Sequence, residues 1–210
     1  HMFGIDLCLF KKKTKEKNFF KINKKTKIII STRTLNPVHN VEVFIDSMPI
    51  IYSKYKNVFF LIIGDGSQKF FLKQKVEQLG LKKNCYFAGM VGEFKLKKFL
   101  QFSDIYVSTS MYDAGLASST AEAMAMSLPV VQTDNSDNRY WLSNNKGGFV
   151  FRNNDYKTLA KHVLTLLKNK KKQIRMGKVN RNIIYKKNNI NIEMSKIEKK
   201  YKDLIRTNEN

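Results

Sequence analysis

The chain has 210 residues, enough for one domain with a sizeable core, and its hydrophobic content of 42% excludes wholesale disorder. Ten glycines and three prolines exclude a fibrous or low-complexity protein. The net charge of +22 leaves two explanations open: a polyanionic partner (nucleic acid or an anionic membrane surface), or a compositional bias that places lysine at tolerant surface positions. Because the lysines are scattered rather than interleaved with exposed aromatic residues, the sequence favours compositional bias and disfavours nucleic acid as a partner.

Neither the cysteines nor the first residues of the chain predict a functional site. Cys8 and Cys85 lie far apart and match no spacing of a metal site or redox motif, and the apolar run around Cys85 predicts a core residue. No uncharged apolar run approaches the roughly 20 residues that span a bilayer, and no secretory signal opens the chain. His1 and Met2 resemble a cloning scar, so we expect an abrupt start at Phe3, as in an excised domain.

Short apolar runs alternate with longer amphipathic stretches along most of the chain. In chain order, they predict a strand at Lys27–Thr32, a loop at Arg33–Asn40, a helix at Val41–Tyr55, a strand at Val58–Ile63, a helix at Gln68–Leu79, a strand at Cys85–Ala88, a helix at Glu93–Phe102, a strand at Ile105–Ser108, a helix at Ser119–Ser127, a strand at Pro129–Gln132, a short helix at Asn138–Leu142, a strand at Gly148–Phe151 and a helix at Asp155–Lys168. Strands that are apolar throughout and separated by helices are typical of a parallel sheet covered on both faces.

The sequence therefore predicts an α/β domain over residues 27–168, with a single Rossmann-like, doubly wound parallel sheet of about six strands. Its ligand should bind at the carboxyl ends of the strands. Residues 1–26 are expected to be the scar and an interdomain linker remnant, with a mobile lysine-rich stretch at Lys11–Lys25. Residues 169–210 are basic and weakly periodic, which predicts one or two extra C-terminal helices packed on the outside of the domain.

The segment Ser108–Thr133 predicts a site for a diphosphate. A strand ends in a loop that contains Gly115, and the helix that follows carries Glu122. The N-terminus of such a helix presents free N–H groups and a partial positive charge. Glu122 could accept hydrogen bonds from two ribose hydroxyls. The alternative is a capping box, in which Glu122 reaches back to the N–H of Ser119.

This segment also resembles a known family. Glu122–Ala125, followed by Leu128–Val131, is similar to the signature of family-4 retaining glycosyltransferases with the GT-B fold. Six further landmarks occur in the family's order: Phe3–Asp6 with Phe10, Arg33–Val41, Ile62–Gly66, Phe87–Val91, Ser103–Val107 and Arg175–Gly177. The resemblance implies the C-terminal, nucleotide-sugar-binding half of a GT-B enzyme.

The family pattern implies roles for particular residues. Glu122 resembles the carboxylate that holds the nucleotide ribose. Gly115, Leu116 and Ala117 resemble the loop whose N–H groups meet the diphosphate and the donor sugar. Gly89, Met90 and Val91 resemble the part that lines the base, and Gly64 resembles the glycine that closes the floor of the cleft.

The sequence departs from the family pattern in two respects, the position of the first acid and the identity of the cations. The family's first acid stands eight residues before the second and contacts the donor sugar; here that place is Ala114, and Asp113 lies nine residues before Glu122. A one-residue loop adjustment would restore the contact of Asp113 with the donor sugar, and the alternative is a turn-forming aspartate.

The cations of the first loop depart from the family pattern as well. Where the family has an arginine, this sequence has Thr34, with Arg33 one residue earlier, and where the family has a lysine, it has His39. Arg33 and His39 are therefore the candidate cations, and the alternative for His39 is an exposed loop histidine.

The resemblance implies sugar transfer from a nucleoside diphosphate sugar with retention of configuration. No Asp-x-Asp pair occurs in the sequence, which agrees with a family that needs no metal, and no cofactor is expected. The acceptor and any general base would belong to an N-terminal domain absent here, so we expect little transfer by this chain alone. The family favours a glycolipid or surface polysaccharide precursor, made at the cytoplasmic face of a membrane.

Two other function classes remain open from the sequence. A nucleotide-sugar epimerase or phosphorylase has the same architecture, because fold does not fix function. A basic nucleic-acid-binding module is the non-enzyme alternative, and it predicts salt-sensitive binding to any polyanion.

Overall fold

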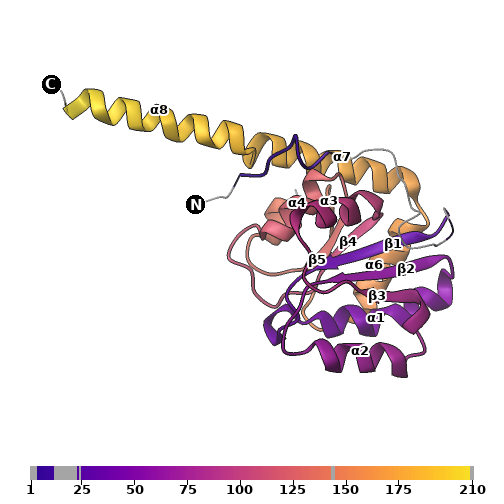
Figure 1. Cartoon of the computed structure of the whole chain (residues 1–210). Coiled ribbons are helices and arrows are strands. Elements are labelled where there is room, and N and C mark those ends of the chain that lie inside the picture. Colours follow the sequence, from indigo (N-terminus) through magenta and orange to yellow (C-terminus); the bar gives the residue numbers. More distant parts are fainter. Residues whose placement is uncertain (1–3, 12–22, 24, 143–144, 209–210) are drawn as a thin grey trace.

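The computed structural model describes residues 4–11, 23, 25–142 and 145–208. Its centre is a six-stranded sheet in the order β3-β2-β1-β4-β5-β6, in which every pairing is parallel (Figure 1). The strands are β1 (Lys27–Thr32), β2 (Val58–Ile63), β3 (Cys85–Phe87), β4 (Ile105–Ser108), β5 (Val130–Thr133) and β6 (Gly148–Phe151). The doubly wound parallel sheet predicted from the sequence is thus confirmed.

The helices alternate with the strands as predicted. They are α1 (Val41–Lys54), α2 (Lys69–Gln78), α3 (Glu93–Phe102), α4 (Ser118–Ala125), α5 (Asn138–Trp141), α6 (Tyr156–Leu167), α7 (Lys170–Lys187) and α8 (Ile190–Asn208), with 3-10 turns η2 (Pro37–His39) and η3 (Lys82–Asn84). Most bounds lie within a residue of the expectation. The turn η2 falls inside the segment expected to be a loop.

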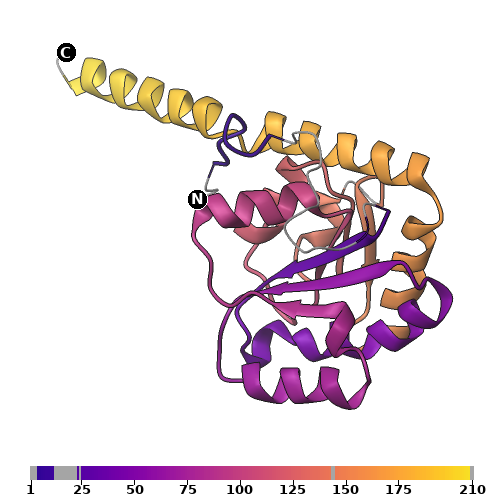
Figure 2. The same ribbon diagram turned by 45° about the vertical axis from the view of Figure 1, so that its right-hand side comes forward.

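The two faces of the sheet carry separate hydrophobic cores. Successive side chains of β1 alternate between them: Ile29 packs in one core, and Ile28 and Ile30 pack in the other. Helices α1, α2 and α6 cover the first face, whereas α3, α4 and α7 cover the second (Figures 1 and 2). Since both faces are buried, the strands need no polar alternation, which is why they read as unbroken apolar runs.

The buried amide of Asn180 is one of the contacts that hold helix α7 on the domain. The Asn180 side chain is fully buried, and its Nδ2 donates to the carbonyl oxygens of Leu128 and Gly147, each at 2.7 Å. These carbonyls belong to the segments that lead into β5 and β6. Asn180 therefore joins α7 to the sheet.

Replacing Asn180 with alanine is expected to lower the free energy of unfolding by roughly 2–4 kcal/mol, because two carbonyl oxygens in the core lose the hydrogen bond that the Asn180 amide donates. Urea denaturation measures the change. Asn182→Ala is the matched control, since Asn182 lies exposed on the same helix and should change stability little. Equal losses in the two variants would contradict the bridging role.

Helix α8 departs from the expected packing on the domain. It continues beyond α7 and extends away from the body of the molecule (Figure 1). Its apolar side chains remain exposed: Met194, Ile197, Tyr201, Leu204 and Ile205. The periodicity that predicts an apolar helix face does not reveal what covers that face, and no described part of the chain covers this one.

The described part of the N-terminal segment packs on the domain. Ile5 and Phe10 are buried, and the Arg181 guanidinium donates to the carbonyl oxygens of Leu7 and Phe10. The residues expected to be a scar, and most of the lysine-rich stretch expected to be mobile, lie outside the described residues.

Candidate functional site

The candidate site lies where the sheet changes its winding direction. Strand β1 pairs with β2 on one side and with β4 on the other. The loops that leave the carboxyl ends of β1 and β4 therefore meet at the topological switch point, where ligands of doubly wound sheets bind. Arg33 directly follows β1, and Asp113 lies in the loop after β4.

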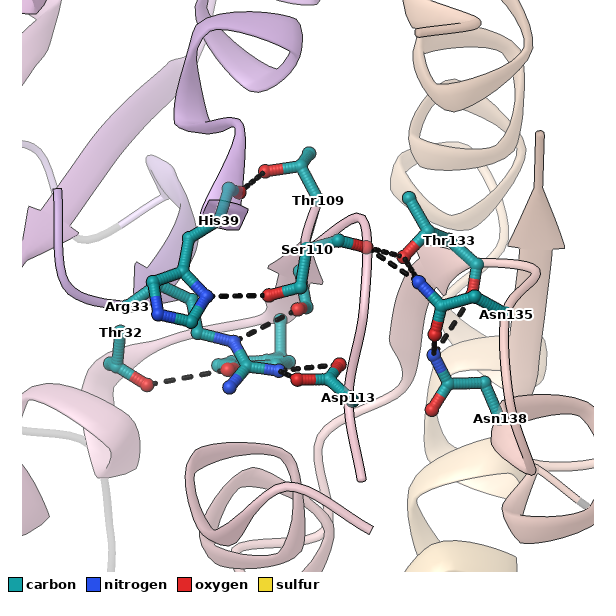
Figure 3. Close-up of polar contacts among 11 residues, drawn as sticks. Thr32, Arg33, His39, Thr109, Ser110, Asp113, Thr133, Asn135 and Asn138 are labelled. Carbon is teal, nitrogen blue, oxygen red and sulfur yellow. Dashed lines mark hydrogen bonds and ion pairs between the residues drawn. The ribbon is translucent and has the colours of Figure 1, made fainter. Parts of the chain in front are cut away.

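Arg33 and Asp113 form a buried ion pair (Figure 3). One guanidinium nitrogen of Arg33, Nη2, lies 2.7 Å from both carboxylate oxygens of Asp113. Its Nε donates to the Ser108 hydroxyl at 3.1 Å. Only 9% of the Arg33 side chain and 6% of the Asp113 side chain are exposed. Burial raises the pKa of Asp113, and the Arg33 charge opposes part of that rise.

His39 lies in the same cluster, beside Arg33 and Ser110. Its Nδ1 lies 3.0 Å from the Ser110 hydroxyl, and its backbone carbonyl accepts from the Thr109 hydroxyl at 2.9 Å (Figure 3). Burial, together with the Arg33 charge, lowers the pKa of His39 below its ordinary value of 6.5. The neutral form of the imidazole is therefore favoured, and that form offers one N–H donor.

A polar network that the sequence reasoning missed fixes the β4 loop. The carbonyl oxygen of Ser110 accepts from the Thr133 hydroxyl at 2.5 Å and from the Asn135 amide at 2.6 Å (Figure 3). Asn138 in turn donates to the Asn135 side chain at 3.0 Å. The only sequence signal was a run of polar residues after β5, at the same edge of the sheet.

The N-terminus of α4 is open to a ligand. Its N-cap is Ala117, so no side chain caps it, and the first helical hydrogen bond runs from the N–H of Ala121 to the carbonyl of Ala117. The N–H groups of the first turn therefore remain available, with the positive end of the helix dipole. The capping-box alternative is wrong, because Ser119 lies inside the helix rather than at its N-cap.

Glu122 is partly buried on α4, near the start of α3. Burial, with the negative charge of Glu93 beside it, raises the pKa of Glu122 from 4.5 to about 7. A carboxylate held in such surroundings gains from a hydrogen-bond donor that can stabilise its ionised form. Glu122 thus lies with the N-termini of α3 and α4, and it is not part of the cluster of Arg33, His39 and Asp113.

Gly64 connects the loops after β1, β2 and β3. Its φ is +136°, and a Cβ atom there would lie 2.0 Å from the carbonyl oxygen of Arg33. Its N–H donates to the carbonyl oxygen of Gly89 at 3.0 Å. Of the predicted base-lining residues, Met90 is 75% exposed and Val91 packs against the second core. Gly115 turns the β4 loop with a φ of +77° and has open space around it.

The described residues lack both a metal-binding cluster and a membrane-spanning helix. No group of three or more His, Cys, Asp or Glu side chains in that part of the chain is arranged to hold a metal ion. No helix there is long and apolar enough to cross a membrane.

Known proteins are similar to this chain in sequence and in fold. The chain is 32% identical over 119 residues to an uncharacterized glycosyltransferase of Methanocaldococcus jannaschii, a match that covers 57% of this chain and 29% of the relative. It is 29% identical over 165 residues to the poly(ribitol-phosphate) alpha-N-acetylglucosaminyltransferase of Staphylococcus aureus, covering 76% of this chain and 32% of that enzyme. The chain thus spans about a third of the length of these relatives.

Among solved structures, a variant of TarM from S. aureus, in complex with fondaparinux, alpha-GlcNAc-glycerol and UDP, superposes with a TM-score of 0.76 at 24% identity. That match covers 90% of this chain and 37% of TarM. The model of the family described as "Glycosyl transferases group 1" matches residues 12–183. The resemblance to GT-B glycosyltransferases is confirmed, and the chain belongs to the glycosyl transferases group 1.

Proposed function

We propose that this chain is the donor-binding domain of a retaining glycosyltransferase and that it binds a nucleoside diphosphate sugar. The observation that carries the proposal is the α4 segment: an uncapped helix N-terminus at the carboxyl edge of the sheet, followed one turn later by Glu122. The free N–H groups suit a diphosphate, and the carboxylate suits the two hydroxyls of a ribose. UDP in the TarM complex supports a nucleotide ligand.

The chemistry follows from the charge of the leaving group. Breaking the bond between the sugar and the diphosphate places negative charge on the phosphate oxygens, and fixed dipoles and cations lower the barrier. The α4 N-terminus and Arg33 supply them here, and neutral His39 adds one hydrogen bond. Gly115, Leu116 and Ala117 would approach the diphosphate and sugar through their backbone, and Gly89, Met90 and Val91 would line the base. No metal is part of this proposal.

The acceptor would bind to residues outside this chain. This chain spans 29% and 32% of the length of the two relatives, which leaves room for a second domain. We therefore expect negligible transfer to simple acceptors by this chain alone. A glycolipid or surface polysaccharide precursor at the cytoplasmic face of a membrane is the proposed acceptor class. Binding to anionic vesicles but not neutral ones, in a flotation assay, tests the membrane contact; equal binding to both would count against it.

Calorimetric titration of the chain with UDP, GDP and ADP in moderate salt tests donor binding. We expect one nucleotide to bind selectively and Glu122→Ala to weaken it by on the order of 100-fold, because two hydrogen bonds to a charged acceptor are lost. Glu77→Ala is the control, because Glu77 is exposed and pairs with Lys82 at the surface. Binding of all polyanions alike, abolished by salt, would contradict the proposal.

A further inference from the structure

Two of the three guanidinium nitrogens of Arg33 already donate hydrogen bonds inside the protein. Nη2 contacts both oxygens of Asp113 at 2.7 Å, and Nε contacts the Ser108 hydroxyl at 3.1 Å. Both partners lie on or after β4, so the guanidinium is fixed against the neighbouring strand. Among the hydrogen bonds of the described residues, Nη1 makes none, and it is the nitrogen left for a ligand.

The Asp113 carboxylate is likewise paired inside the protein. Both of its carboxylate oxygens face Arg33, and 7% of the residue is exposed. Only 6% of the Asp113 side chain is exposed, so the paired carboxylate offers little surface to a sugar hydroxyl. A hydroxyl that displaced Arg33 would leave an uncompensated buried charge. Ala114, which stands at the family's place for the sugar-binding acid, is exposed. The loop therefore turns the acid inward to Arg33, rather than shifting it outward to restore the family contact.

We propose that Asp113 is a positioning residue: together with Ser108 it orients Arg33 for the diphosphate, and it takes no hydroxyl of the donor sugar. This inference rests on the proposed function. An arginine held at two of its nitrogens loses little freedom when a phosphate binds the third, so the diphosphate meets a preorganised cation. The discrimination of the donor sugar then falls to other groups, such as the backbone around Gly115.

The test uses three ligands that carry the same base, the one selected in the titration above. They are the nucleoside, the nucleoside diphosphate and the nucleoside diphosphate glucose (the glucose ester). Asp113→Asn is expected to weaken the diphosphate and the glucose ester by the same factor, about 10-fold, and to leave nucleoside binding unchanged. In an Arg33→Ala background, Asp113→Asn should have no further effect, because the two residues act as one unit. Asp46→Asn, which breaks a remote ion pair with Lys75, controls for general loss of stability.

The outcomes separate the two roles of Asp113. Unchanged diphosphate binding with weaker binding of the glucose ester would show a sugar contact and overturn the inference. Ser108→Ala, which removes only the acceptor of Arg33 Nε, is the second variant if Asp113→Asn does not fold, and it should also weaken the diphosphate and the glucose ester by the same factor while leaving the nucleoside unchanged. If the unmodified chain binds none of the three nucleotides, the proposed function itself fails, and this inference with it.

Discussion

Glu122→Gln is expected to make the folded chain more stable at pH 8 while it weakens nucleotide binding. The pKa of Glu122 rises from 4.5 to about 7 on folding, so the folded state holds its proton more tightly than the unfolded state. Stability is therefore lost as the pH rises from about 4.5 to about 7, where the folded protein must ionise a partly buried carboxyl. The full change corresponds to roughly 3 kcal/mol above pH 7. Glutamine keeps the shape and removes this cost.

Thermal unfolding at two pH values measures the effect. At pH 8 the melting temperature of Glu122→Gln should exceed that of the unmodified chain by roughly 5–10 °C. Near pH 4.5 the two should coincide, since the glutamic acid is then protonated in the folded state. Nucleotide affinity at pH 8 should fall at least 10-fold, because the amide accepts hydrogen bonds less strongly than a carboxylate. The same gain at both pH values would contradict the assigned cause.

The strands and helices were predictable because their determinants are local. Runs such as Val58–Ile63 are apolar throughout, and a strand buried on both faces needs no other pattern. The proximity of Arg33 and His39 to Asp113 could also be predicted from the sequence, because all three residues follow adjacent parallel strands. Their family resemblance supplied candidate roles, and the geometry brings these three residues together.

The roles of individual side chains depended on contacts between distant segments. Asp113 lies one residue from the family's place, and spacing cannot say whether that residue turns inward to Arg33 or outward to a ligand. The spacing of Ser119 and Glu122 fits a capping box, yet the helix begins one residue earlier, at Ser118. The lowered pKa of His39 follows mainly from its burial, which no local pattern encodes.

Gly64→Ala is expected to damage both the fold and the site. A residue with a φ of +136° is strained unless it is glycine, and the added Cβ would lie 2.0 Å from the Arg33 carbonyl oxygen and 2.9 Å from its carbonyl carbon. Both contacts are with backbone, which cannot rotate away as a side chain can. We expect a loss of about 3 kcal/mol or more in the free energy of unfolding.

Gly80→Ala separates the two causes of that loss. Gly80 also has a positive φ, +69°, but a Cβ there meets nothing within 4 Å, so alanine should cost only about 1 kcal/mol. Relief of the clash at Gly64 must move the backbone of Arg33, and with it the guanidinium held by Asp113. Urea denaturation should therefore show the larger loss for Gly64→Ala, and calorimetry should show weaker diphosphate binding in that variant alone. Equal stability losses and intact binding in both variants would mean that the β1 and β2 loops can separate without disturbing Arg33.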